Sequence, residues 1–240
     1  MKSHPFFALF LIVLLLSSPV SDLSGSSPES GFIRDNPKIG NSGQVLVVRA
    51  PDRETKIAEA AAWERDGNGR WNPVFGPLRA VIGKKGFAPA GEKSEGDGRT
   101  PSGLFRLGFA FGYGPSPPTR VPYRQAEDDT IWVDDANAPD YNQWTKKGAT
   151  AASSFEWMRR KDGLYRFGIV IEYNMNPVVS GKGSAIFLHI WRGPEEPTEG
   201  CVALAEPDVL KILGWLDPAR KPLIIMGIED GFRETPGKER

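Results

Sequence analysis

The sequence predicts a mainly β fold with one short helix. Its 240 residues include 27 Gly and 21 Pro, which favour many turns over long helices. Several short segments are dense in Val, Ile and other apolar residues, as is typical of strands. Apolar residues recur convincingly at helical spacing in one late segment, which therefore predicts the helix.

Six segments have the composition of strands and are bounded by turn residues. They are residues 44–49, 78–82, 104–111, 166–173, 184–191 and 222–226. Residues 56–63 are ambiguous, because their alanines also allow a helix. The turn signal Asp66-Gly67-Asn68-Gly69 follows them, so we expect a hairpin at this point.

Residues 184–191 (SAIFLHIW) alternate, so that every second side chain faces the same side of the strand. One face carries only aliphatic residues after Ser184. The other places His189 between two aromatic residues, Phe187 and Trp191. A histidine therefore stands on a strand face beside aromatic rings.

The helix is expected to begin near Glu206. An acidic first turn around Pro207 suits a helix N-terminus. The apolar residues that follow recur at i, i+3, i+4 and i+7, as a core-facing stripe requires: Val209, Ile212, Leu213 and Leu216. Asp217-Pro218 ends the pattern.

Two stretches, residues 83–103 and 112–160, are expected to be long irregular loops, and such loops are often functional. In the first, Asp97 and Arg99 are expected to order their own loop. In the second, we expect a lid over the functional site, formed by three neighbouring residues: Tyr141, Asn142 and Trp144.

The first 24 residues have the layout of a secretory signal peptide. Lys2 precedes an apolar run over residues 6–16, and small residues follow. The run is too short to span a bilayer comfortably, although retention as an anchor is the alternative. We therefore expect an exported protein, with a flexible lead-in over residues 25–42 and a polar tail over residues 228–240.

Composition excludes several kinds of function. The 30 basic and 30 acidic residues cancel, so charge does not favour nucleic acid or an anionic membrane as a partner. Cys201 is the single cysteine, which excludes an intramolecular disulfide. Once the signal peptide and its His4 are removed, His189 is the remaining histidine. A Cys/His zinc site is thereby excluded, and we expect no metal.

Cys201 and His189 are the candidate nucleophile and general base. They lie twelve residues apart, and a strand followed by a returning loop can bring them together. Gly200 permits a close approach of the backbone, and its N–H group and that of Cys201 are candidate donors to an oxyanion. Each residue alone has a plainer interpretation, as a buried thiol or a core histidine.

The motif H-x(8)-T-E-G-C-V-A-L resembles the catalytic domain of YkuD-type L,D-transpeptidases, and so does the segment GDGRTPSGLF at residues 96–105. The resemblance covers residues 43–227. It implies two packed β sheets. With the signal-peptide pattern, we expect a location in the periplasm or cell envelope, and the expected mechanism requires no cofactor. This chain resembles a divergent subgroup, with a shorter His-to-Cys spacing, Glu199 where a second His often precedes the Gly, and Ala203 where an Arg commonly follows the Cys.

The resemblance implies cysteine acyl transfer on peptidoglycan stem tetrapeptides, in cell-wall biogenesis and cell shape. Cys201 attacks the third-residue carbonyl and releases the terminal D-alanine. His189 takes the thiol proton, or the two residues rest as a thiolate–imidazolium pair with a lowered thiol pKa. The acceptor is an amine of a second stem, for cross-linking, or of a lysine on a wall-anchored protein. We expect a monomer.

The alternative is that water replaces the amine, which would make the protein an L,D-carboxypeptidase or an amidase with the same site. A non-catalytic wall-binding module and a thiol redox protein are functions of other classes. Redox chemistry usually needs a second cysteine, and a pure binder does not need a reactive thiol.

Four residues near the pair are candidate substrate contacts: Arg192, Thr198, Glu199 and Trp191. Arg192 would suit a substrate carboxylate. Glu199 would suit a substrate amine, or would orient His189. The plainer interpretations are a surface arginine, a solvated loop charge and, for Trp191, packing within the sheet.

Overall fold

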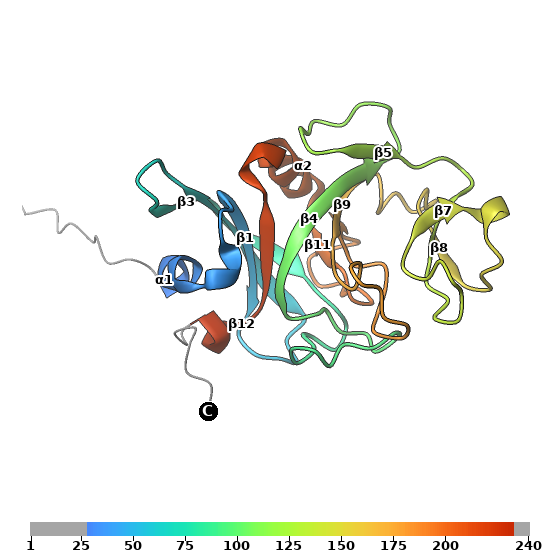
Figure 1. The fold of residues 1–240 in the computed structure, drawn as a ribbon, viewed down its shortest axis with the longest axis horizontal. Coiled ribbons are helices and arrows are strands. Elements are labelled where there is room, and N and C mark those ends of the chain that lie inside the picture. Colours follow the sequence, from blue (N-terminus) through green and yellow to red (C-terminus); the bar gives the residue numbers. More distant parts are fainter. Residues whose placement is uncertain (1–27, 233–240) are drawn as a thin grey trace, which may run out of the picture.

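The computed structural model describes residues 28–232 and is mainly β, as the sequence predicts (Figure 1). The larger sheet contains β1 (Gln44–Ala50), β2 (Ile57–Arg65), β3 (Trp71–Val81), β4 (Gly103–Gly112), β5 (Tyr123–Gln125), β9 (Phe167–Ile171), β10 (Phe187–Ile190), β11 (Val202–Leu204) and β12 (Leu223–Ile228). The smaller sheet contains β6 (Thr130–Val133), β7 (Trp144–Lys146) and β8 (Phe155–Trp157). The α-helices are α1 (Pro28–Asp35) and α2 (Glu206–Trp215). Short 3-10 turns lie at Pro37–Ile39, Lys147–Ala149, Pro218–Arg220 and Glu229–Phe232.

The larger sheet closes on itself. Its strand order is β12-β1-β2-β3-β11-β10-β9-β4-β5, and β12 also pairs with β4. In that closing pair Leu223 lies opposite Arg106, and Met226 lies opposite Gly103. The two halves of the ring contribute side chains to one core, so they form the packed β layers that the sequence resemblance implies.

Side chains that point into the ring form the main core. Leu46 of β1, Leu188 of β10 and Ile224 of β12 belong to it and are fully buried. Helix α2 packs against β9 and β10 and adds its apolar stripe to this core. The helix predicted from that stripe is confirmed, and all four of its residues are fully buried: Val209, Ile212, Leu213 and Leu216.

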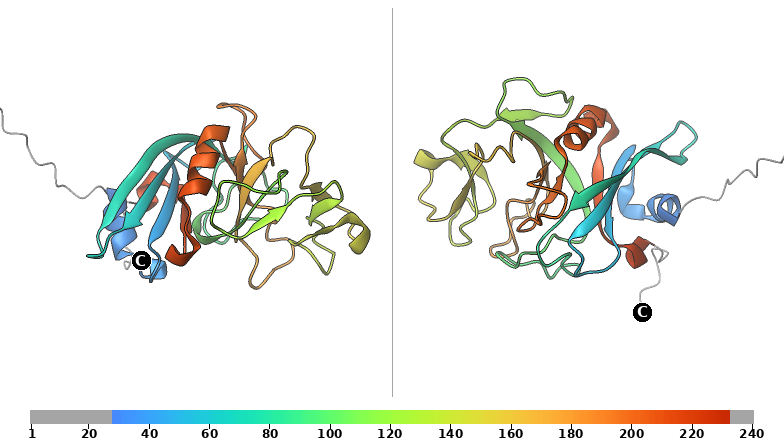
Figure 2. Two further views of the ribbon diagram at one scale, coloured as in Figure 1. Left: turned by 90° about the horizontal axis from the view of Figure 1, so that it is seen from above. Right: turned by 180° about the vertical axis from the view of Figure 1, so that it is seen from behind.

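Two further apolar clusters cover the outside of the ring at opposite ends of the molecule (Figure 2). At one end, Ile33 of α1 packs with Val45 and other residues of β1, β2, β3 and β12. At the other end, the segment that includes the smaller sheet covers β4, β9 and β10, with Trp132 of β6 packed edge-on against Phe187. The second cluster also contains Cys201, so the smaller sheet helps to build the candidate site.

The hairpin predicted around residues 66–69 is confirmed, because β2 and β3 pair antiparallel across it. The separate strand predicted at residues 78–82 is the end of the longer β3. Pro73, Gly76 and Pro77 suggest a break in the sequence, but the strand passes through them with register shifts against β2. Such irregularities let one strand continue where a regular ladder would end.

Residues 112–160 are not as irregular as predicted, because they contain β5 to β8. These strands have three or four residues each, too few for an alternating pattern to be visible in the sequence. The flexible lead-in expected over residues 25–42 contains α1 and a 3-10 turn. Ile33 and Ile39 are buried there, and the surrounding Ser, Gly and Pro residues conceal that signal.

Replacing Ile33 with alanine tests whether α1 is docked. Because the side chain is fully buried, we expect a loss of about 2–4 kcal/mol in the free energy of unfolding. Denaturant titration of the purified protein measures the loss. The adjacent exposed Arg34→Ala is the control and is expected to leave stability unchanged. Equal stability of both variants would show that α1 does not contribute to the core.

The predicted signal peptide lies outside the described residues. Within residues 28–232, no helix combines the length and the apolar character needed to cross a membrane.

Candidate active site

The sheet register places Cys201 and His189 on one face. Strands β10 and β11 are parallel, with Leu188 opposite Val202, so Cys201 lies beside Phe187 at the start of β11. Phe187 and His189 share a face by alternation. Two residues along the strand and one strand across correspond to a Cα separation of about 8 Å. The histidine and the thiol are therefore diagonal neighbours.

Both side chains line one cavity of about 180 Å³. Its walls come from the ends of β10 and β11, from the turn before Cys201, and from the segment after β8. Other lining residues include Glu156, Arg160, Tyr165, Trp191, Thr198 and Glu199. The cavity is smaller than the roughly 300–1,000 Å³ of sites that enclose a drug-sized ligand, so it suits the reacting part of a substrate.

His189 is buried and held in one tautomer. Its Nδ1 lies 2.8 Å from the carbonyl oxygen of Ile190, which can only accept, so Nδ1 carries the proton. Nε2 is then left with the lone pair that a general base needs. The Tyr165 ring packs edge-on against the imidazole, with 5.0 Å between the centroids. Burial lowers the pKa of His189 to about 4, so the imidazole is neutral at physiological pH.

Cys201 is 7% exposed and rests as a thiol. Its Sγ donates to the carbonyl of Ala185 at 3.2 Å and accepts from the N–H of Phe187 at 3.4 Å. Burial raises the pKa of Cys201 to about 12, and the negative charge of Glu156 adds to the effect. A resting thiolate–imidazolium pair, one of the two states expected from the sequence, is therefore wrong for this conformation.

Two threonines hold the backbone at Cys201. The Thr198 hydroxyl donates to the Cys201 carbonyl at 2.6 Å, and the Thr100 hydroxyl donates to the same oxygen at 3.3 Å. The Gly200 N–H donates to Thr198 Oγ1 at 3.1 Å. Gly200 is therefore not a free oxyanion donor in this conformation, contrary to the expectation from the sequence. The Cys201 N–H makes no hydrogen bond to any residue within 28–232.

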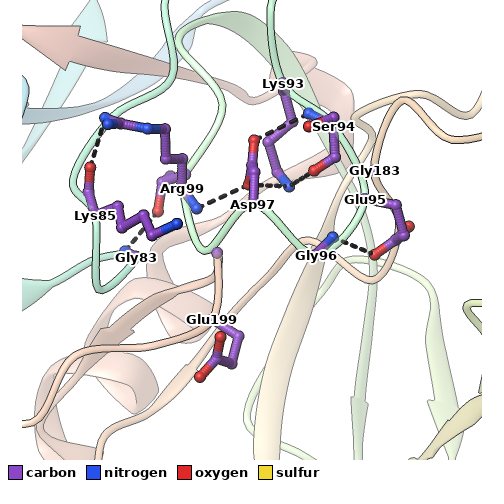
Figure 3. A network of polar contacts seen from close by, with 12 residues as sticks. Gly83, Lys85, Lys93, Ser94, Glu95, Gly96, Asp97, Arg99, Gly183 and Glu199 are labelled. Atoms are coloured by element: carbon purple, nitrogen blue, oxygen red, sulfur yellow. Dashed lines mark hydrogen bonds and ion pairs between the residues drawn. The ribbon is translucent and has the colours of Figure 1, made fainter.

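Gly200 is needed for close packing. A Cβ atom at this position would lie 3.0 Å from the carbonyl oxygen of Arg99, in the loop after β3. That loop is ordered internally, as the sequence predicts (Figure 3). Asp97 is at its centre and accepts from Lys93 Nζ at 2.7 Å and from the Arg99 N–H at 2.8 Å. The loop that includes residues 96–103 thus packs closely against the turn that carries the thiol and supports it.

Thr100 links this loop to the turn that carries Cys201. Its buried hydroxyl also accepts from the Gly83 N–H at 2.9 Å. We expect Thr100→Val, which keeps the shape, to lower the free energy of unfolding by about 1–3 kcal/mol, because a buried N–H loses its acceptor. Thermal or denaturant unfolding measures the change.

The matched control is Thr145→Val in β7, where no side-chain hydrogen bond to the described part of the chain is lost. If Thr100→Val lost no more free energy of unfolding than Thr145→Val, Thr100 would not stabilise the turn that carries Cys201.

The expected substrate contacts line the cavity, but two of them are paired with other residues. The Arg192 Nη2 atom lies 3.0 Å from Asp162 Oδ2. Glu199 is well exposed, and its Oε2 atom lies 2.7 Å from Lys84 Nζ. Glu199 therefore does not orient His189. Trp191 and Thr198 line the cavity directly.

The lid expected from Tyr141, Asn142 and Trp144 is wrong. Tyr141 and Asn142 are buried, and none of the three residues lines the cavity with Cys201. The Asn142 side chain accepts from the Trp132 indole at 2.9 Å, and Trp144 packs edge-on against Phe109. Asn142 therefore bonds to the smaller sheet, and Trp144 packs that sheet against β4.

Glu156 and Tyr165 are site residues that the sequence does not reveal. The Tyr165 hydroxyl donates to Glu156, while the Tyr165 ring contacts His189. Glu156 stands in the three-residue strand β8, where no motif or periodic pattern marks it. Among residues 28–232, no three His, Cys, Asp or Glu side chains are grouped to hold a metal ion.

A family model described as the L,D-transpeptidase catalytic domain, YkuD, matches residues 44–225, about three quarters of the chain. No curated protein and no solved structure matches the chain significantly. The match includes His189, Cys201 and the loop that contains residues 96–103, and it covers all residues that line the cavity described above.

Proposed function

The chain belongs to the L,D-transpeptidase catalytic domain (YkuD) family, and from this premise we propose that it transfers a peptidyl group from a peptidoglycan stem tetrapeptide to an amine through Cys201. One observation carries the proposal. The single cysteine of the chain and the single histidine of residues 28–232 line one small cavity on the same face of the sheet. A thiol and an imidazole base are the groups that cysteine acyl transfer requires.

Acylation begins from the neutral pair. Nε2 of His189 takes the thiol proton as Cys201 Sγ attacks the carbonyl carbon of the third stem residue. The amide C–N bond then breaks, and the protonated imidazole gives its proton to the departing nitrogen of D-alanine. A thioester on Cys201 and a neutral His189 remain. The side chains share no hydrogen bond in the described free protein, so bound substrate must bring them into line.

Charge on the tetrahedral intermediate needs a donor. The Cys201 N–H is the favoured candidate, because it is adjacent to the sulfur and makes no hydrogen bond to any other described residue. The two threonine hydroxyls on the Cys201 carbonyl fix the orientation of the turn before substrate arrives.

Deacylation distinguishes the two candidate reactions. An amine that attacks the thioester gives transpeptidation, and water gives the carboxypeptidase or amidase reaction with the same residues. The test is incubation with one isotope-labelled tetrapeptide, with and without an amine acceptor, followed by product mass. A cross-linked or amine-extended tripeptide supports the transferase, whereas a free tripeptide at all acceptor concentrations supports the hydrolase.

We also propose that the protein acts outside the cytoplasm, in the periplasm or cell envelope. The basic start and the apolar run over residues 6–16 support this location. N-terminal sequencing of the exported protein is expected to give a start shortly after residue 18. An intact Met1 in that pool would contradict cleavage.

A further inference from the structure

The cavity that contains Cys201 adjoins a larger one. Glu156 and Arg160 line both of them. The larger cavity has a volume of about 990 Å³ and lies along β8, with Phe155 and Trp157 in its lining. Because the smaller cavity has room only for the reacting part of a substrate, the rest of an acceptor chain needs a wider neighbouring space. Glu156 stands on the boundary between these two spaces.

Glu156 is a carboxylate without a direct ion pair, although the charge of Arg160 acts on it and partly offsets the rise in its pKa that burial causes. It is partly buried and accepts one hydrogen bond from the Tyr165 hydroxyl. No ion pair joins it to a Lys, Arg or His of the described chain. A carboxylate accepts up to about four hydrogen bonds, and removing it from water is costly unless a positive group pairs with it. Loss of solvent accordingly raises its pKa.

The nearby guanidinium groups are already paired. The Arg160 Nη2 atom lies 2.7 Å from Asp162 Oδ2. The Arg159 Nε atom lies 3.0 Å from Asp128 Oδ1. Arg160 also lies over the Tyr165 ring, 5.1 Å from its centroid. The protein therefore places a carboxylate without a direct ion pair at the cavity boundary, while Arg159 and Arg160 pair with other carboxylates. This arrangement suits a positive group that arrives with a ligand.

We propose that Glu156 binds the primary ammonium group of the acyl acceptor and guides it to the Cys201 thioester. The inference rests on the proposed function, because it assigns the acceptor side of that reaction. The ligand chemistry is a primary alkylammonium, which a stem-peptide side chain and a protein lysine both present. An ammonium carries three donors, so it can bond Glu156 while its chain extends along β8.

The reaction balances without any further reagent. Glu156 accepts one proton from the ammonium, which leaves a neutral amine beside the thioester. The amine nitrogen attacks the carbonyl carbon and passes a second proton to Nε2 of His189. The C–S bond breaks, and the departing sulfur of Cys201 takes that proton from His189. Product release lets Glu156 return its proton to solvent.

The test is the ratio of amine-extended product to hydrolysed product in wild type and in Glu156→Gln. The glutamine keeps an oxygen that accepts from Tyr165, but it removes the charge. We expect the ratio to fall by about tenfold or more at subsaturating acceptor, because a charged hydrogen bond is lost. The rate of acyl-enzyme formation is measured in parallel and is not expected to fall, because removing the negative charge of Glu156 lessens the rise in the pKa of Cys201. Nα-acetyl-lysine amide and a free stem tripeptide serve as separate acceptors and distinguish the two amine sources.

Glu127→Gln is the matched control. It makes the same change in charge, but Glu127 pairs with Lys146 and lines neither cavity. An unchanged ratio in Glu156→Gln with normal acylation would overturn the inference alone. A parallel loss of acylation would overturn it as well, since Glu156 would then serve the donor. If the wild type forms no acyl-enzyme, the proposed function fails, and the inference fails with it.

Discussion

Cys201→Ser is expected to remove peptidyl transfer almost completely, with a loss on the order of 10³-fold or more in turnover. A serine hydroxyl is a far weaker acid than a thiol, and the neutral His189 is not basic enough to compensate. No thioester can form. Product release from a labelled tetrapeptide, followed by mass spectrometry, measures the loss.

The substitution is expected to leave the fold intact. It changes one atom at a buried position, and a hydroxyl can keep both bonds of the thiol, to the carbonyl of Ala185 and from the N–H of Phe187. The melting temperature of the variant is the control for this expectation. Turnover close to that of the wild type in a normally folded Cys201→Ser protein would show that another residue is the nucleophile.

The second large effect concerns thiol reactivity in the resting enzyme. Cys201 is expected to react with iodoacetamide at pH 7 about 100-fold more slowly than a free model thiol. Raising the pKa from about 8.5 to about 12 lowers the thiolate fraction roughly 3,000-fold. The more basic thiolate is intrinsically a better nucleophile and recovers about 40-fold of that loss. Burial of the sulfur slows the reaction further.

The pH dependence of the labelling rate follows from the same shift in the pKa of Cys201. The thiolate fraction should rise tenfold with each pH unit up to the unfolding limit, without a plateau near pH 7. His189 has a pKa of about 4 and stays neutral over this range, so His189→Ala should not slow labelling. Because Cys201 is the single cysteine, the label reports on it alone, and urea-unfolded protein gives the reference rate. Labelling faster than the model thiol at pH 6 would instead demonstrate a resting ion pair.

A neutral pair is compatible with catalysis. The low pKa keeps the imidazole in its basic form at any pH well above 4, so the base is available whenever substrate binds. The buried thiol is protected from adventitious oxidants and alkylating agents, because these react with the thiolate. In the proposed mechanism, substrate binding has to align Nε2 with the sulfur, which would link activation of the thiol to the presence of a donor peptide.

Local patterns in the sequence were sufficient to place His189 on its strand face. Alternation along residues 184–191 puts His189 on the aromatic face of β10, and that face is where the structure has Phe187, Tyr165 and Cys201. The turn at residues 66–69 and the stripe on α2 are local signals of the same kind. Each of these signals depends only on residues that are close to one another in the sequence.

Features that depend on distant residues could not be predicted in this way. The ring closes by pairing residues 103–106 with residues 223–226, and no periodicity links segments so far apart. Glu156 reaches the site because β8 joins a small sheet whose strands are too short to show a pattern. The pKa directions of Cys201 and His189 depend on burial, to which distant segments contribute: the smaller sheet packs in one cluster with Cys201, and the Tyr165 ring packs on His189.

The central claim is that Cys201 carries the peptidyl group, and intact mass after incubation with a tetrapeptide donor tests it most directly. The expected result is a mass increase equal to the mass of the donor minus the mass of free D-alanine. The proton that leaves the thiol is already counted in the free D-alanine. The added mass should map to the peptide that contains Cys201 and be absent from Cys201→Ser. Tripeptide products formed without any adduct on Cys201, or an adduct on a different residue, would contradict the account.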